Sequence, residues 1–208
     1  VDADPARYAT ATPGDGRYID IDNNKILDAD DRTIIGNPAP DFIWGFTNNF
    51  SFKGFDLSIL FQGVQGGDLM DENAHRSMLY HEGRNYAQVL VNRWRSEADP
   101  GDGYHYKLKV DLDGYEKTPS SYWLNDASYF RLKSLTLGYT VPSYLLNKIR
   151  ISSARVYVNA TNLFTHKNTL VIDPEAFAGD VSDVTRRGVN GNSYPAAQVI
   201  SLGINLGL

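Results

Sequence analysis

Five oxygen-bearing side chains near the N-terminus recur at a spacing that can hold a calcium ion. They are Asp20, Asp22, Asn24, Asp28 and Asp31, at positions 1, 3, 5, 9 and 12 of a loop. This is the ligand spacing of an EF-hand loop, in which a main-chain carbonyl, here that of Ile26, supplies position 7. Lys25 stands at position 6, where the sharp turn normally needs glycine. Two interpretations stay open: a calcium-binding loop and a solvated acidic loop.

A second set of candidate contact residues is aromatic and falls in the stretch 64–126, which also holds a predicted short helix over residues 85–95. Its members are Trp94, Tyr104, Tyr106, Tyr122 and Trp123. Such rings could stack on sugars or pack against a partner protein, or they could pack with one another inside the loop. No nucleophile elbow, phosphate loop, dinucleotide fingerprint or zinc-ligand pair is present, so the sequence indicates no enzyme.

Bulk composition limits the classes of function. The chain has 208 residues, a net charge of −5 and a pI near 5.3, and it has no basic stripe to neutralise nucleic-acid phosphates. It contains no cysteine, which excludes a disulfide framework and a thiolate metal site within it. No apolar run reaches the roughly 20 residues of a transmembrane helix, and no signal peptide is visible. Because the sequence starts at Val1, we expect a C-terminal segment of a longer exported protein.

The elements that must position these residues are strands with alternating side chains. Apolar residues fall on even positions in 42–52 and on odd positions in 55–61, with Lys53-Gly54 between the two runs. A two-residue turn at Lys53-Gly54 predicts a hairpin over residues 41–63 with one aromatic, uncharged face. The predicted opposing pairs are Phe52 with Phe55, Phe50 with Leu57 and Phe46 with Phe61.

Alternation predicts three further strands, over residues 127–140, 153–164 and 196–208. The pattern of the first of these is inconsistent along its length. The apolar row of its C-terminal half is in phase with Arg131 and Lys133 of its N-terminal half. Either that half stands clear of lipid, or a β-bulge shifts the register.

The apolar rows of the five predicted strands form one candidate lipid-facing surface. Its members are Phe42, Trp44, Phe46, Phe50, Phe55, Leu57, Ile59, Phe61, Leu135, Leu137, Val156, Val158, Ile200, Leu202, Ile204 and Leu206. The rows of the first, second, fourth and fifth strands contain no charge, and Lys or Arg at the middle of a bilayer would cost about 2–4 kcal/mol. A soluble β-sandwich also alternates apolar and polar residues, and it remains the competing interpretation.

The lengths of the connections favour a membrane barrel over the sandwich. Residues 1–40, 64–126 and 165–195 form long connections, whereas Lys53-Gly54 and residues 141–152 form short ones. Outer-membrane barrels have long extracellular loops and short periplasmic turns. We therefore assign the three long segments to the extracellular side and the two short ones to the periplasmic side.

Several short motifs occur in a fixed order along the chain. They are Asp30–Pro38 with Pro40-Asp41-Phe42, Phe55–Ser58 with Phe61-Gln62-Gly63, Ala127–Lys133 with Leu137–Pro142, Arg155–Val158 with Asn162-Leu163-Phe164, Asp173-Pro174-Glu175, and Tyr194-Pro195. As an ordered set, which spans almost the whole chain, they resemble the last part of SusC/RagA-type TonB-linked outer-membrane receptors.

The resemblance implies an all-β fold, namely the last five or so antiparallel strands of a 22-stranded transmembrane barrel in a Gram-negative outer membrane. It further implies a SusD-like lipoprotein lid, a link to the TonB complex through a missing N-terminal part, and import of glycans or peptides without a catalytic step. Five strands do not close a barrel, so the chain alone is not expected to transport. Two rivals remain: a soluble secreted carbohydrate-binding β-sandwich and a calcium-dependent adhesion module built on the acidic loop.

Overall fold

The computed structural model divides the chain into two compact units. The first unit is Val1–Gly36 with Met70–Leu124, and the second is Asn37–Leu69 with Asn125–Leu208. The residues that the structure describes are 12–71, 86–108, 119–147, 151–169, 171–175, 187–190 and 194–207. Among these residues, no helix is long and apolar enough to cross a membrane.

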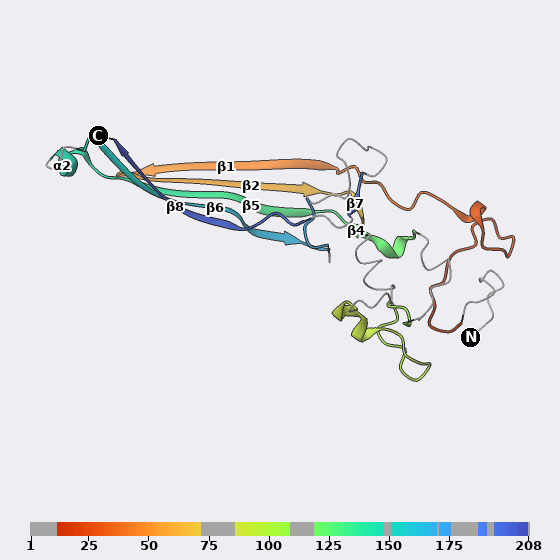
Figure 1. Ribbon diagram of the computed structural model, residues 1–208. Helices are drawn as coiled ribbons and strands as arrows, with labels where there is room; N and C mark the ends of the chain where they lie inside the picture. The colour runs from red at the N-terminus through yellow and green to blue at the C-terminus, as the bar shows by residue number, and fades with distance from the viewer. Residues whose placement is uncertain are drawn as a thin grey trace. The chain divides into compact units, whose positions relative to one another are not determined.

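The second unit is built on one five-stranded sheet in the order β1-β2-β5-β6-β8, with every neighbouring pair antiparallel (Figure 1). The strands are β1 (Phe42–Phe52), β2 (Phe55–Gln65), β5 (Tyr129–Thr140), β6 (Ser153–Lys167) and β8 (Val199–Gly207). A four-residue helix, α2 (Ser143–Leu146), lies in the connection between β5 and β6. The sheet confirms an antiparallel all-β fold with long strands, since strands of soluble proteins more often run to about 5–6 residues.

The β1–β2 hairpin has the predicted register. Phe52 pairs with Phe55, and the ladder continues through Phe50 with Leu57 to Phe46 with Phe61. The turn residues Lys53 and Gly54 both have positive φ, at 47° and 89°. Two consecutive left-handed residues are the requirement of a type I′ turn, whose twist matches that of the flanking strands. The turn chemistry and the alternation of side chains therefore agree.

A β-bulge at Lys133 resolves the inconsistent pattern of the third predicted strand. Along β5, Ser134 pairs with Leu60, but the next pair is Leu132 with Phe61, so Lys133 is an extra residue. Because the register shifts by one, Leu132 lies opposite Phe61 on the apolar face of the sheet. Arg131 is thereby turned to the other face, so the second of the two sequence-based alternatives is confirmed.

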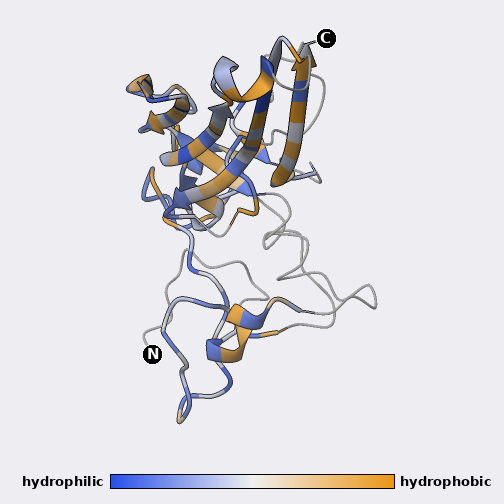
Figure 2. Ribbon diagram, turned by 90° about the vertical axis from the view of Figure 1, so that its left-hand side faces the viewer, coloured by the Kyte–Doolittle hydropathy of each residue, from blue (hydrophilic) through white to orange (hydrophobic). Residues whose placement is uncertain are grey.

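The two faces of the sheet differ sharply in polarity, as the alternating orange and blue bands along the strands show (Figure 2). Eleven members of the predicted lipid-facing row are exposed: Phe42, Phe46, Phe50, Phe55, Leu137, Val156, Val158, Ile200, Leu202, Ile204 and Leu206. The other five are half-buried: Trp44, Leu57, Ile59, Phe61 and Leu135. A contiguous exposed apolar surface of this width marks an interaction with lipid or protein.

A smaller three-stranded sheet was not predicted from the sequence. Its order is β4 (Leu124–Asp126), β3 (Asp68–Asp71), β7 (Val189–Asn190). These strands have two to four residues each, which is too short for a visible alternation of polarity.

Short 3₁₀ helices and a small core organise the first unit. The helices are η1 (Ala29–Asp31), η2 (Gln88–Asn92) and η4 (Ser121–Trp123). Leu90 and Trp123 form the buried core, against which Tyr106 and Tyr122 pack. The helix predicted over residues 85–95 is only η2, because the Trp94 amide donates to the His105 carbonyl at 3.0 Å and the chain leaves the helical path there.

Candidate functional site

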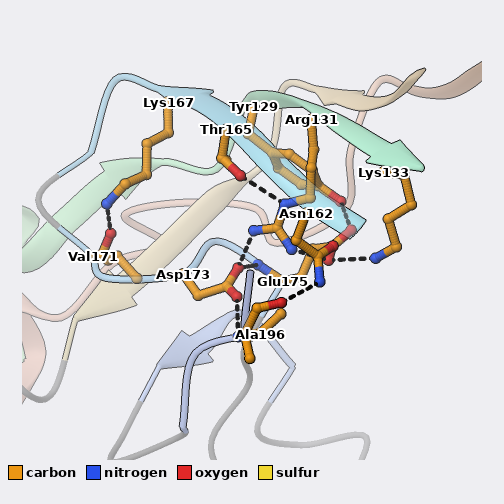
Figure 3. A network of polar contacts seen from close by, with 11 residues as sticks. Tyr129, Arg131, Lys133, Asn162, Thr165, Lys167, Val171, Asp173, Glu175 and Ala196 are labelled. Atoms are coloured by element: carbon orange, nitrogen blue, oxygen red, sulfur yellow. Dashed lines mark hydrogen bonds and ion pairs between the residues drawn. The ribbon is translucent and has the colours of Figure 1, made fainter. Parts of the chain in front are cut away.

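A buried ion-pair network centred on Arg131 lies on the polar face of the sheet (Figure 3). The Arg131 guanidinium donates to Asp173 Oδ1 at 2.6 Å, to Glu175 Oε2 at 2.5 Å and to Thr165 Oγ1 at 2.8 Å. The side chains of Arg131 and Asp173 are only 3% and 4% exposed. A buried guanidinium needs such partners, since an uncompensated buried charge is strongly destabilising.

Glu175 gathers three donors from β5. Besides Arg131, the Lys133 ammonium donates to Oε2 at 2.8 Å and the Tyr129 hydroxyl donates to Oε1 at 2.9 Å. Tyr129, Arg131 and Lys133 alternate with Phe130 and Leu132, so they point to the same side of the strand, and the bulge at Lys133 sets that side opposite the apolar row of the C-terminal half. The segment that carries Glu175 is thus fixed to the strand by charge-assisted hydrogen bonds.

Asp173 holds together the two ends of a long connection. Its Oδ1 accepts from the Glu175 amide at 3.0 Å, and its Oδ2 accepts from the Ala196 amide at 2.7 Å. Burial alone raises the pKa of Asp173, but these two amides and Arg131 outweigh it, so the pKa is lowered. The carboxylate therefore stays ionised and ties the segment before Glu175 to the approach to β8.

Sequence reasoning used Asp173-Pro174-Glu175 only as a family motif and missed its role as an ionic anchor. Two signals were available. A pair of carboxylates flanks Pro174, and Arg131 and Lys133 are the charged residues of an otherwise uncharged strand. Cations placed inside a strand need anions elsewhere in the fold, but the sequence does not say where.

A second ion pair crosses the polar face over a glycine. Arg155 of β6 donates to Asp56 of β2 at 2.5 Å and 3.1 Å, although β5 lies between these strands. Gly138 is the β5 residue beneath the pair, and a Cβ there would collide with both side chains. The guanidinium also lies 5.1 Å from the centre of the Tyr157 ring. Charged groups therefore span three strands on the face opposite the apolar row.

The predicted aromatic residues form one stacked cluster and one separate contact. The Tyr122 ring stacks on Tyr106 at 4.4 Å between centroids and on Tyr104 at 4.8 Å, and Trp123 meets Tyr122 edge to face at 4.6 Å. Trp94 lies against Gly14 instead. Trp123 is buried, whereas Tyr104 is 57% exposed and presents the most open surface of the cluster. Much of the aromatic surface is thus used for packing inside the loop.

His105, which the sequence did not single out, completes this cluster. Its Nδ1 lies 2.5 Å from Asp102 Oδ2, and its ring meets Tyr104 edge to face at 5.2 Å. The backbone amides of His105 and Tyr104, together with the His105 side chain, lower the pKa of Asp102 to about 2. Burial and the nearby Tyr104 and Asp102 raise the pKa of Tyr122, which keeps the phenol neutral.

A cleft of about 880 Å³ opens in the first unit beside the tyrosine stack. Tyr106 and Tyr122 contribute to its wall, and the acidic N-terminal segment contributes further lining that includes Arg17, Arg32 and Ile35. This size lies within the range of small-molecule sites, and the lining mixes aromatic, aliphatic and charged groups.

The acidic loop brings together three of its five predicted metal ligands. Carboxylate oxygens of Asp20, Asp22 and Asp31 lie within 4.8 Å of one another. Asp28 instead caps η1 by accepting from the Asp30 amide at 2.8 Å. The Asn24 amide group is also engaged, because its Oδ1 accepts from the Ile26 amide at 2.7 Å and its Nδ2 donates to Asp22 at 2.9 Å.

The local backbone explains how the loop turns without glycine. Lys25 has a φ of 69°, so it adopts the left-handed conformation that glycine normally supplies. The Asn24 amide lowers the pKa of Asp22, but desolvation and the neighbouring Asp20 and Asp31 outweigh it and raise the pKa overall. Amides of Asp28 and Ile21 lower the pKa of Asp31. Three converging carboxylates, one of them with a raised pKa, suit a hard divalent cation.

Comparisons with known proteins place these features in context. No protein-family model matches the chain. TonB-dependent receptor P3 of Formosa agariphila is 32% identical over 197 residues, which are 93% of this chain and 19% of that receptor. TonB-dependent receptor SusC of Bacteroides thetaiotaomicron is 24% identical over 195 residues, 93% of this chain and 18% of that receptor.

Solved structures agree with the sequence relatives. The RagAB peptide importer in its open-open state matches with a TM-score of 0.70 and 28% identity, over 88% of this chain and 19% of that chain. The resemblance to SusC/RagA-type TonB-dependent receptors is confirmed. The chain spans about a fifth of the length of the TonB-dependent receptors that it matches. TonB-dependent receptors are outer-membrane proteins.

Proposed function

We propose that this chain forms part of the wall of an outer-membrane TonB-dependent transporter that imports glycans or peptides. The single observation that carries the proposal is the two-faced sheet. One face exposes a charge-free apolar row across β1, β2, β5, β6 and β8, whereas the other carries the ion pairs of Arg131 and Arg155. This is the polarity of a barrel wall, which is apolar toward lipid and polar toward the lumen.

The connections at the two ends of the sheet indicate which end faces which side of the membrane. The turn at Lys53-Gly54 and the connection with α2 lie at one end, which we assign to the periplasm. Segments 64–126 and 165–195 leave from the other end, which we assign to the exterior. The Arg131 network then lies at the extracellular end of the wall, where it fixes the base of an external connection.

The proposed transporter also includes a SusD-like lipoprotein lid and a link to the TonB complex. Tyr104 and the cleft beside Tyr106 and Tyr122 are the groups of this chain that we assign to contact with substrate or lid. RagAB, whose structure this chain matches, is a peptide importer, and this supports peptides as one substrate class. As part of a transporter, this chain is proposed to take no part in catalysis.

The test uses the complete receptor in its host. We expect the receptor to fractionate with the outer membrane, and a strain without it to lose uptake of either a labelled oligosaccharide or a labelled peptide. Uptake should also stop when TonB is disrupted while the receptor stays in the membrane. Recovery of the receptor as a soluble secreted protein would reject the proposal and favour the carbohydrate-binding module.

A further inference from the structure

Helix α2 exposes two large apolar side chains side by side. Tyr144 is 69% exposed and the adjacent Leu145 is 50% exposed, whereas Leu146 is buried. The helix begins directly after Pro142 and has four residues. Figure 1 shows it beyond the end of the sheet where β1 and β8 also end. Exposed apolar groups of this size are unusual in a connection between strands, where Gly, Pro, Asn, Asp and Ser dominate.

The same end of the sheet carries other aromatic residues on the apolar face. Phe52 pairs with Phe55, and Phe55 pairs with Tyr139, so the three lie in lateral register across β1, β2 and β5. The rings of Phe55 and Tyr139 are 4.5 Å apart, and Phe52 and Phe55 are both exposed. The Lys53 ammonium lies 5.1 Å from the centre of the Phe52 ring.

This arrangement has the composition of a membrane interface. Aromatic belts sit at headgroup level at both ends of a barrel wall, where one end of the ring is in apolar surroundings and the other is wet. Lysine beside such a belt keeps its stem on the apolar surface and its charge in water. Tyr139 ends the apolar row of β5, and Tyr144 follows after a few residues of connection.

We propose that α2 is an interfacial anchor, in which Tyr144 and Leu145 insert among the phospholipid headgroups of the periplasmic leaflet. The proposal rests on the proposed outer-membrane location and extends it to a connection outside the sheet. Lipid is the favoured occupant because α2 lies beyond the end of the sheet that carries Phe52, Phe55 and Tyr139 on its apolar face. A helix of one turn also lacks the i, i+3, i+4 and i+7 positions with which helices dock in protein grooves.

The experiment places single cysteines, labelled with an environment-sensitive fluorophore, in the complete receptor reconstituted in phospholipid vesicles. This chain has no cysteine of its own, and cysteines elsewhere in the receptor are replaced by serine. Variants Tyr144→Cys and Leu145→Cys test α2. Leu202→Cys reports the apolar face of the sheet, and Tyr194→Cys reports an exposed site in an external connection. Quenching is measured with lipids that carry a nitroxide either near the headgroup or deep in the acyl chain.

The outcomes separate this proposal from the one on which it rests. We expect labels at 144 and 145 to lose more fluorescence to the shallow nitroxide, the label at 202 to lose more to the deep nitroxide, and the label at 194 to be unaffected by both. If 202 is quenched while 144 and 145 behave like 194, the barrel wall stands and the anchor is wrong. If 202 itself escapes quenching, the membrane orientation fails and the anchor fails with it. Labels at 144 and 145 shielded from both lipid and aqueous quenchers would indicate a protein partner and would also overturn the anchor.

Discussion

Replacing Arg131 with methionine should loosen the connection that its guanidinium anchors. The substitution keeps the apolar stem but leaves the carboxylate of Asp173, only 4% exposed, without its cation. Removing one partner of a buried ion pair typically costs about 3–5 kcal/mol. Asp173 keeps the amides of Glu175 and Ala196, and Glu175 keeps Lys133 and Tyr129, so we expect the lower end, about 3 kcal/mol.

Native-state hydrogen exchange of the complete receptor in detergent measures this loss locally. The amides of Glu175 and Ala196 both donate to Asp173, so they exchange when the network opens. A loss of about 3 kcal/mol corresponds to exchange about 100-fold faster in the peptides that contain these two amides. Peptides from β1 serve as the internal reference, because β1 pairs with β2 and is separated by it from β5, which carries the network.

A neighbouring lysine provides the matched control. Lys133 also binds Glu175, but it is 35% exposed, and partly solvated pairs of this kind contribute about 0–1 kcal/mol. The Lys133→Met receptor should therefore exchange less than about fivefold faster at the same amides. If Arg131→Met and Lys133→Met have the same small effect on exchange, the buried Arg131 network does not fix the connection to the strand.

Three further perturbations address the membrane face, the acidic loop and the tyrosine cluster. Leu202→Arg places a charge on the apolar face and should cost about 2–4 kcal/mol in lipid, which lowers the amount of folded, heat-modifiable receptor in outer membranes. Ser201→Arg, on the other face, should leave that amount unchanged. Equal yields of the two variants would contradict the assigned faces. Calcium titrated into the receptor should release or absorb heat that Asp20→Asn removes, and a titration indistinguishable from buffer dilution would leave a solvated acidic loop. The folded pKa of Asp102 is about 2, below the ordinary 3.8, so its stabilisation is present above pH 3.8 and is lost as the pH falls to about 2. Near-ultraviolet circular dichroism of the tyrosines should fade over that interval, and Asp102→Asn should lack this step.

The parts of the fold that the sequence predicts are those in which local chemistry and long-range pairing agree. The hairpin is one, because Lys53-Gly54 favours a tight turn and alternation fixes which faces meet. The sequence of β5 left two alternatives open, a polar half that stands clear of lipid and a β-bulge. One extra residue moves every later side chain to the opposite face of the sheet, and the sequence does not mark where that residue occurs. The helix α2 was missed because four residues show no periodicity.

The candidate sites were predictable only in their residue types. The acidic spacing identified the cluster of Asp20, Asp22 and Asp31. It did not predict that Asp28 caps η1, because aspartate is a preferred side chain both for helix capping and for metal binding. The partners of Arg131 lie 42 and 44 residues away along the chain, and no local pattern connects them. The number of strands in the complete barrel and the calcium site stay predictions.

The hydrogen bond from the Ala196 amide to Asp173 has a consequence for the divergence of such receptors. It holds Asp173 and Ala196, near the two ends of the connection between β6 and β8, close together. The entropy of closing a loop grows only with the logarithm of its length, by about 0.6 kcal/mol for each doubling. Insertions and deletions between these two points that spare β7 should therefore leave β6 and β8 unchanged. Related receptors should therefore differ in length and sequence on either side of β7 more than within β6 and β8.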